Sequence, residues 1–230
     1  MQDSIPEKDK ATPKATTERI LDAAECLFAN QGIRATSLRE ITEQAGINNA
    51  AVNYYFRSKD ALVRAVFERS FKPLNRERLR LLDEVEAAAG DGPLRMEAVL
   101  YALFEPMVRA WREDRNFIFL VGRLHNEPDP ELNGFVTALY DELLTRFLAA
   151  TVRAIPELPE PELFFWVYFL FGGVVFILLS SRDLERLRAG GNLLDAPEDF
   201  LQRLIAFGAA GIRARVAAAQ PAVAGLVEAR

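Results

Sequence analysis

The sequence contains a single histidine, His125, and a single cysteine, Cys26. Metal sites built from imidazole and thiolate groups need several such ligands, so a multi-histidine metal site is excluded, and we expect no metal and no cofactor. One cysteine cannot close an internal disulfide, which is typical of a reducing cytoplasm. A Gly-rich phosphate loop and a recognisable nucleophile–base pair are missing as well, so the sequence does not predict an enzyme.

The chain also has few β-branched runs and no apolar segment near its start. Its first six residues, Met-Gln-Asp-Ser-Ile-Pro, lack the apolar core of a signal peptide, so we expect a cytoplasmic protein. Ala, Leu, Glu and Arg dominate instead, and 50% of the residues are hydrophobic. This composition predicts an all-α fold with ample material for a core.

The formal net charge of −5 disfavours nucleic-acid binding at first sight. The charge is unevenly distributed, because residues 1–70 hold ten Lys and Arg against ten Asp and Glu, and the acidic excess lies in the rest of the chain. A neutral N-terminal segment can still bind DNA where its cations face phosphates locally.

Residues 36–56 carry the most specific pattern. Ser37 and Glu40 form a capping box, which predicts the start of a helix. Gly46 predicts its end, because glycine readily adopts the left-handed conformation of a helix C-terminus. A second short segment with apolar residues at helical spacing follows. Two short helices joined by a glycine turn predict a helix-turn-helix whose second helix enters the DNA major groove.

Polar and small side chains in and around this second helix supply the chemistry for DNA recognition. The candidate DNA contacts are Thr36, Arg39, Asn48, Asn49, Ala50, Ala51, Asn53 and Tyr54. Asparagine amides can pair bidentately with adenine, and alanine methyl groups can contact the methyl group of thymine. Capping of the second helix is the alternative role of Asn48 and Asn49. Thr36 and Arg39 lie at or near a helix N-terminus, where they are predicted to contact phosphates.

The run from residue 18 to residue 71 resembles the DNA-binding domain of the tetracycline-repressor (TetR) family. The resemblance rests on Ala-Gly-Ile at 45–47 followed by Asn-Tyr-Tyr-Phe-Arg-Ser-Lys-Asp-Ala-Leu at 53–62. It implies that Tyr55 and Lys59 contact phosphates, with packing inside the domain as the alternative for Tyr55. Asn53 stands where many members carry an aromatic residue, and Ala51 where a hydroxyl residue is common, so the resemblance does not give the operator sequence.

The remaining sequence divides the chain. Charged and polar residues at 1–15 predict a flexible arm, 16–72 the helix-turn-helix domain, 73–216 a larger helical domain, and 217–230 a frayed tail. Pro73 is expected to separate the last helix of the first domain from the first helix of the second. Pro106 is expected to kink or split a helix.

Residues 163–179 form the most apolar stretch. A helix of this length spans about 25 Å, short of the roughly 30 Å of a bilayer core. Since no cationic cluster flanks the stretch on one side, we expect no membrane span. A helix that is apolar all round can instead be buried against a partner subunit. With residues 197–216 it is predicted to form a symmetric homodimer interface. A helical scaffold or membrane-associated protein anchored by residues 163–179 is the alternative function.

The family resemblance implies that the larger domain binds a small effector, which shifts two DNA-binding domains and releases the operator. The candidate pocket residues are Phe104, Trp111, Phe117, Arg123, His125, Tyr140, Trp166 and Phe169, with core packing as the alternative for each. Because most of these residues are aromatic, the set favours a lipophilic ligand such as an acyl chain or an aromatic compound. Arg123 or His125 would contact the polar end of that ligand. The sequence therefore predicts a dimeric, ligand-responsive transcriptional regulator, with repression as the expected mode.

Overall fold

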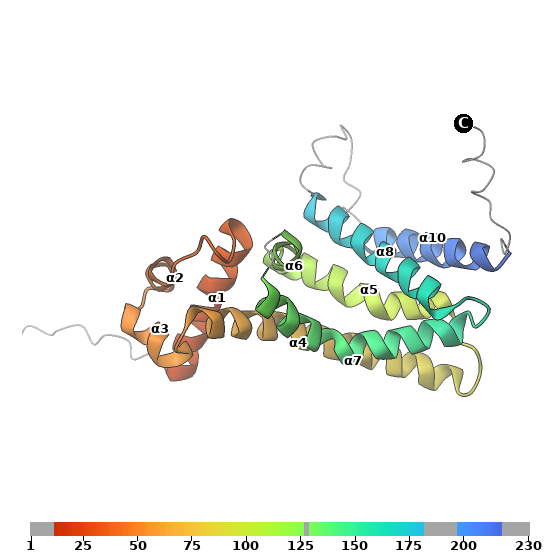
Figure 1. Cartoon of the computed structure of the whole chain (residues 1–230), viewed down its shortest axis with the longest axis horizontal. Helices are drawn as coiled ribbons and strands as arrows, with labels where there is room; N and C mark the ends of the chain where they lie inside the picture. Colours follow the sequence, from red (N-terminus) through yellow and green to blue (C-terminus); the bar gives the residue numbers. More distant parts are fainter. Residues whose placement is uncertain (1–11, 127–128, 182–196, 218–230) are drawn as a thin grey trace, which may run out of the picture.

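The computed structural model describes residues 12–126, 129–181 and 197–217, and the regular structure in these ranges is helical (Figure 1). The helices are α1 (Pro13–Gln31), α2 (Leu38–Ala45), α3 (Asn49–Phe56), α4 (Lys59–Ala89), α5 (Met96–Glu113), α6 (Asn116–Asn126), α7 (Pro130–Ala154), α8 (Glu160–Leu179) and α10 (Pro197–Ala217). The all-α prediction is confirmed. Most of the predicted arm and nearly all of the predicted tail lie outside the described residues. Helix α1 begins at Pro13, inside the range predicted as an arm, because the Thr12 side chain caps it and Pro13 suits its first turn.

Figure 1 shows two parts joined by one long helix. Helices α1, α2 and α3 with the start of α4 form a head, and the other helices form a larger body. Helix α4 runs from one part into the other through Pro73, so the predicted break at this proline is wrong. Phe71 and Leu74 are buried on either side of it. Burial of these side chains against neighbouring helices offsets the hydrogen bond that proline cannot donate. Helix α5 likewise continues through Pro106, which is buried.

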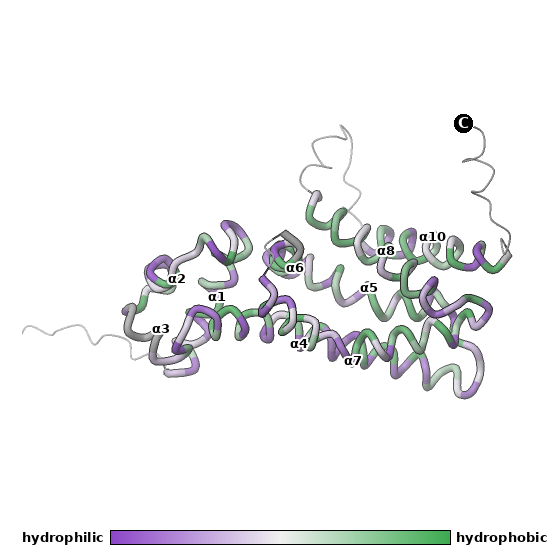
Figure 2. Tube along the Cα trace, viewed as in Figure 1, coloured by the Kyte–Doolittle hydropathy of each residue, from purple (hydrophilic) through white to green (hydrophobic). Residues whose placement is uncertain are grey.

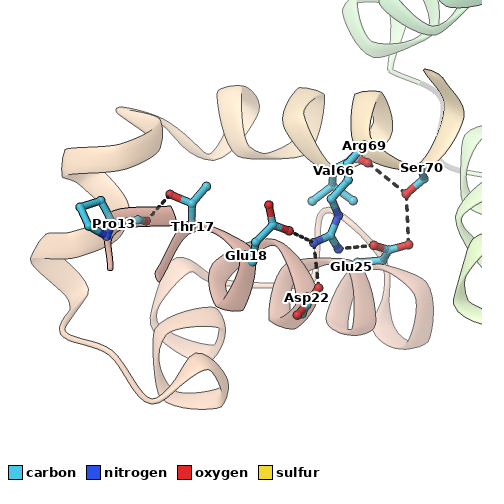
Figure 3. Close-up of polar contacts among 8 residues, drawn as sticks. All are labelled: Pro13, Thr17, Glu18, Asp22, Glu25, Val66, Arg69 and Ser70. Atoms are coloured by element: carbon cyan, nitrogen blue, oxygen red, sulfur yellow. Dashed lines mark hydrogen bonds and ion pairs between the residues drawn. The ribbon is translucent and has the colours of Figure 1, made fainter. Parts of the chain in front are cut away.

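Polar contacts fix α1 across α4 within the head (Figure 3). The Arg69 guanidinium of α4 donates to Asp22 at 2.8 Å and to Glu18 at 3.3 Å. It also donates to Glu25, which accepts a further hydrogen bond from the Ser70 hydroxyl at 3.1 Å. Glu25 is the least exposed of these three carboxylates. The head is therefore held on the long helix by a charged cluster as well as by its apolar core.

Helices α8 and α10 pack against each other along one long edge of the body, and α8 is coloured hydrophobic over most of its length (Figure 2). Leu163, Leu170 and Val174 of α8 are buried. The other sides of the two helices leave large apolar side chains exposed, among them Phe165, Phe169, Phe176 and Phe207. Among the described helices, α8 is the one that length and composition would allow to cross a membrane, and 28% of its apolar window is buried.

Candidate nucleic-acid interface and ligand cavity

The turn between α2 and α3 has the geometry that its sequence predicts. The Ser37 backbone N–H donates to the Glu40 carboxylate at 2.7 Å, and the Glu40 N–H donates to the Ser37 hydroxyl at 3.2 Å. The bond from the Ser37 backbone lowers the pKa of Glu40. Gly46 adopts the left-handed conformation, with φ of 63° and ψ of 40°. The following N–H, of Ile47, donates to the Thr42 carbonyl at 3.0 Å. The predicted capping box and glycine turn are confirmed.

Arg19 of α1 forms hydrogen bonds to the turn between α2 and α3. Its Nη2 donates to the Ala45 carbonyl at 2.5 Å and to the Gly46 carbonyl at 3.2 Å. A Cβ atom at position 46 would lie 2.9 Å from the same nitrogen. The positive φ favours glycine at this position, and a larger residue would in addition have to displace the end of the Arg19 side chain.

Helix α3 has one face in the core and another in solvent. Val52 is buried, whereas the Tyr54 side chain is exposed and Asn48 is exposed at the start of the helix. Tyr55 is half-buried, with its ring centroid 5.1 Å from that of Tyr54. The side chains of four candidate contacts lie outside the described residues: Asn49, Ala50, Ala51 and Asn53. Among the described side chains of α3, Val52 therefore faces the core and Tyr54 faces solvent.

The candidate phosphate contacts differ in their environments. Arg39 is exposed and forms an ion pair with Glu43 at 2.8 Å, one helical turn away. The Lys59 ammonium donates to the Arg34 carbonyl at 3.3 Å, which holds it between the α1–α2 loop and α4. Thr36 is 1% exposed, and its hydroxyl donates to the Gly32 carbonyl at 2.7 Å. Because its side chain is buried and bonded, Thr36 does not fit the predicted phosphate contact in this conformation.

A cavity of about 420 Å³ lies in the body, bounded by α4, α5, α6, α7 and α8. Its volume is within the roughly 300–1,000 Å³ of small-molecule sites. Most of its lining is apolar, and five aromatic rings contribute, namely Tyr140, Phe147, Phe164, Tyr168 and Phe171. Its lining from α4 is a charged residue, Arg78.

Arg78 is buried, with a relative exposure of 1%. Its Nε donates to the Leu103 carbonyl at 2.9 Å, and its Nη1 donates to Asn75 Oδ1 at 3.4 Å. Its Nη2 has no hydrogen-bond partner within the described part of the chain. Burial lowers the pKa of Arg78, and burial raises the pKa of Tyr140 to about 12 despite the opposing effect of the neighbouring guanidinium. At neutral pH the cavity therefore holds a neutral tyrosine hydroxyl beside an arginine, which stays protonated.

Helix α6 connects the cavity with the head. Val121 and Leu124 line the cavity. Between them in the sequence, Arg123 donates to the Asn30 carbonyl at 2.9 Å and to the Ala29 carbonyl at 3.2 Å, at the C-terminal end of α1. Helix α6 therefore contacts both the cavity and the first helix of the head.

Two family models match the chain in the order of these two parts. Residues 20–66 match "Bacterial regulatory proteins, tetR family", and residues 97–211, half of the chain, match "Tetracyclin repressor-like, C-terminal domain". This chain belongs to the TetR family of transcriptional regulators. TetR-family proteins are DNA-binding regulators rather than enzymes, which confirms both the resemblance and the expectation that this protein is not an enzyme.

Sequence similarity to individual TetR-family relatives covers a limited part of the chain. The HTH-type transcriptional regulator AcrR of Shigella flexneri is 38% identical over 63 residues, which is 27% of this chain and 29% of that protein. The chain thus aligns with less than a third of the length of this relative. Among solved structures, FadR from Bacillus subtilis in complex with stearoyl-CoA has a TM-score of 0.62 at 14% identity, covering 82% of this chain and 97% of its own. A TetR-like regulator from Rhodococcus sp. RHA1 has a TM-score of 0.55 at 22% identity, with 90% and 100% covered. These structural similarities establish the shared TetR fold.

The TetR-family body places most of the predicted pocket residues elsewhere. Of the seven whose side chains are described, Tyr140 lines the cavity, and the side chain of His125 lies outside the described residues. The other six do not line this cavity, namely Phe104, Trp111, Phe117, Arg123, Trp166 and Phe169. The first three are buried in the core, Arg123 bonds to α1, Trp166 donates to Glu162 at 3.4 Å, and Phe169 is exposed. The aromatic residues in the sequence pointed to helices that line the cavity, but the number of aromatic residues does not show which face of each helix borders it.

The sequence interpretation missed Arg78. The signal for it lies in α4, where Asn75 and Arg78 interrupt a stripe of buried apolar residues that includes Phe71, Leu74 and Leu82. A buried charge without a carboxylate partner is rare in a core that serves packing alone.

Proposed function

We propose that this TetR-family protein is a homodimeric, ligand-responsive repressor that binds a palindromic operator and is released by a lipophilic effector. The observation that carries the proposal is the pairing of two sites in one chain: a helix-turn-helix with an outward face on α3, and an apolar cavity in the body. Helix α4 and the contact of Arg123 with α1 join the two sites.

Base readout in this proposal comes from α3, with Asn48, Asn49 and Asn53 as amide donors and acceptors, and with Ala50, Ala51 and Tyr54 beside them. Phosphate contacts come from Arg39, Tyr55 and Lys59. Arg39 has to exchange Glu43 for a phosphate, which is feasible because the ion pair is exposed and therefore weak. Thr36 positions the α1–α2 loop instead of contacting DNA.

The proposed dimer forms through α8 and α10. Exposed rings on these helices include Phe169 at 59%, Phe176 at 67% and Phe207 at 72%, an apolar surface of the kind that marks interfaces. Gly172 and Gly173 have open space where a Cβ would project, so a partner helix can approach closely. Burial of this surface in a two-fold four-helix arrangement would hold two heads at a fixed separation.

Release of DNA follows from the position of α6 and α8 in the cavity wall. A ligand that fits the cavity only when α6 is displaced favours a second arrangement of the heads. The complex of FadR from B. subtilis with stearoyl-CoA supports a lipophilic ligand for this chain. A differential affinity of a few kcal/mol between the two states suffices to change occupancy of the operator.

Two substitutions in the head test this proposal with DNA selected from a random pool. Lys59→Ala is expected to weaken binding to all sequences and to lower the slope of log K against log salt by roughly one, because one phosphate contact is lost. Asn53→Ala is expected to change which base is preferred at one position of each half-site. Electrophoretic mobility shifts across a salt series measure both effects. Unchanged affinity and unchanged preference in both variants would contradict the proposed docking of α3.

A further inference from the structure

The cavity in the body contains a positive charge, that of Arg78, with no acidic side chain among the described residues of its lining. Arg78 forms no ion pair with a carboxylate in the described part of the chain, and the lining described there contains no Asp or Glu. Two of its three nitrogens donate to neutral oxygens, those of Leu103 and Asn75. Buried charges in proteins are ordinarily paired, because an uncompensated ion in an apolar interior is strongly unfavourable.

The unpartnered nitrogen belongs to a residue of the cavity wall rather than to the packed core. Arg78 and Tyr140 both line the cavity, and the guanidinium acts on the Tyr140 hydroxyl through its charge and through side-chain hydrogen bonding, while Nη2 keeps no partner in the described part of the chain. Guanidinium N–H groups only donate hydrogen bonds, and a protonated tyrosine hydroxyl can donate one as well. The two side chains therefore offer adjacent donors and one positive charge at a single place on an otherwise mainly apolar wall.

The rest of the cavity wall determines what kind of molecule can carry an anionic group that binds at Arg78 and Tyr140. Phe147, Phe164 and Phe171 line the cavity with apolar rings. The polar side chains that remain are neutral, namely those of Asn133, Thr137, Thr151 and Tyr168. A small inorganic anion would satisfy Arg78 but would leave this apolar space unfilled. A neutral lipid would fill the space but would leave Nη2 without an acceptor, at a cost comparable to that of a lost hydrogen bond.

We propose that the cavity binds an amphiphile with a single anionic group, a carboxylate, which accepts hydrogen bonds from Arg78 Nη2 and the Tyr140 hydroxyl while its apolar part lies against the aromatic wall. This inference rests on the proposed function in taking the cavity to be the effector site, and it adds the chemical class of the effector. Arginine suits this role because its planar fork matches a carboxylate geometrically.

The experiment compares ligands that share a tail and differ in head group. Dodecanoate, dodecanol and dodecyltrimethylammonium are titrated into the full-length protein below their micellar concentrations, and affinities are measured by calorimetry. Dodecanoate is expected to bind about 10- to 100-fold more tightly than dodecanol, the range for hydrogen bonds to charged groups. The cation is expected to bind most weakly. Equal affinity of the carboxylate and the alcohol in the unaltered protein would overturn the inference, as would failure of dodecanoate to bind.

Substitutions of Arg78 and Tyr140 test which side chains cause the preference for dodecanoate over dodecanol. Arg78→Met is expected to lose the preference for dodecanoate while retaining its affinity for dodecanol, whereas Arg78→Lys keeps part of the preference because it keeps the charge. Tyr140→Phe is expected to show a smaller loss confined to dodecanoate. A full preference in folded Arg78→Met, checked by circular dichroism, would overturn the assignment. The comparison of head groups in the unaltered protein remains decisive if that variant does not fold.

Release of operator DNA by the same ligands separates this inference from the proposed function. Preferential binding of the carboxylate without any release of DNA would uphold the head-group assignment and contradict control of DNA by the cavity. Release by the carboxylate and the alcohol at equal concentrations would contradict the head-group assignment and uphold control of DNA.

Discussion

Replacing Arg78 by methionine is expected to make the ligand-free protein more stable. The guanidinium is fully buried, burial lowers its pKa, and its Nη2 has no partner in the described structure. Methionine has a similar length and flexibility but neither charge nor donors. The substitution therefore removes an unfavourable buried charge from the free protein, and it does so at the wall of a cavity, where a change of volume is tolerated.

The magnitude follows from opposing contributions. Removal of an unsatisfied buried donor is worth about 1–3 kcal/mol. Replacement of buried ionic groups by apolar side chains stabilises other proteins by about 1–4 kcal/mol. Against this, two hydrogen bonds of Arg78 are lost: the one to Asn75 Oδ1, which at 3.4 Å is weak, and the 2.9 Å hydrogen bond to the Leu103 carbonyl. That carbonyl lies within α5, where the helix supplies another donor, so its loss is worth only about 1 kcal/mol. The expected net gain is about 1–2 kcal/mol.

Urea unfolding measures this difference. Both tryptophans, Trp111 and Trp166, lie in the body, so their fluorescence reports on the part that contains the substitution. Protein concentration has to be held constant, because dimerisation contributes to apparent stability. Arg80→Met is the matched control, since Arg80 lies on the same helix with half of its side chain exposed, and its effect is expected to stay within about 0.5 kcal/mol. A loss of stability in Arg78→Met beyond that of the control would refute the reasoning.

Three further outcomes are expected. Gly46→Ala should destabilise the head by about 1–2 kcal/mol, because alanine is strained at positive φ, and hydrogen exchange in α2 should accelerate. Arg69→Met should loosen α1 by about 2 kcal/mol, since it leaves three α1 carboxylates without their partly buried cation, and exchange in α1 should respond before the body does. Arg213 lowers the pKa of Glu97 to about 2, below the ordinary 4.5. This pair should therefore stabilise the protein above pH 4.5 and cease to do so as the pH falls towards 2. After allowance for solvent screening it is worth about 1 kcal/mol, and an acid titration of Arg213→Met should lack that component.

The head could be predicted from sequence because its signals are local. The reciprocal bonds of Ser37 and Glu40 and the left-handed Gly46 depend on residues a few positions apart, so short patterns carry them. Pro73 shows the limit of such reasoning. A proline removes one hydrogen bond, but burial of Phe71 and Leu74 on the two sides of it keeps α4 continuous. Tertiary packing of this kind is not visible in a local pattern.

The residues that line the cavity could not be predicted from the sequence, because this too depends on tertiary packing. Phe104 and Phe147 are both buried aromatic residues on helices of the body, yet the first packs in the core and the second lines the cavity. The difference depends on how five helices fit together and not on the type of residue. Arg78 carries a signal of its own, a charge within a buried stripe, and that signal points to a ligand more directly than the aromatic residues do.

Selection of duplexes from a random pool tests the central claim most directly, because it presupposes neither an operator nor an effector. The claim is that two heads on a paired body contact successive turns of one duplex. It predicts an enriched inverted repeat with half-site centres about 34–36 Å apart, or a multiple of that, bound by a dimer in light scattering. Enrichment of a single half-site bound by one chain, or no enrichment at all, would contradict it.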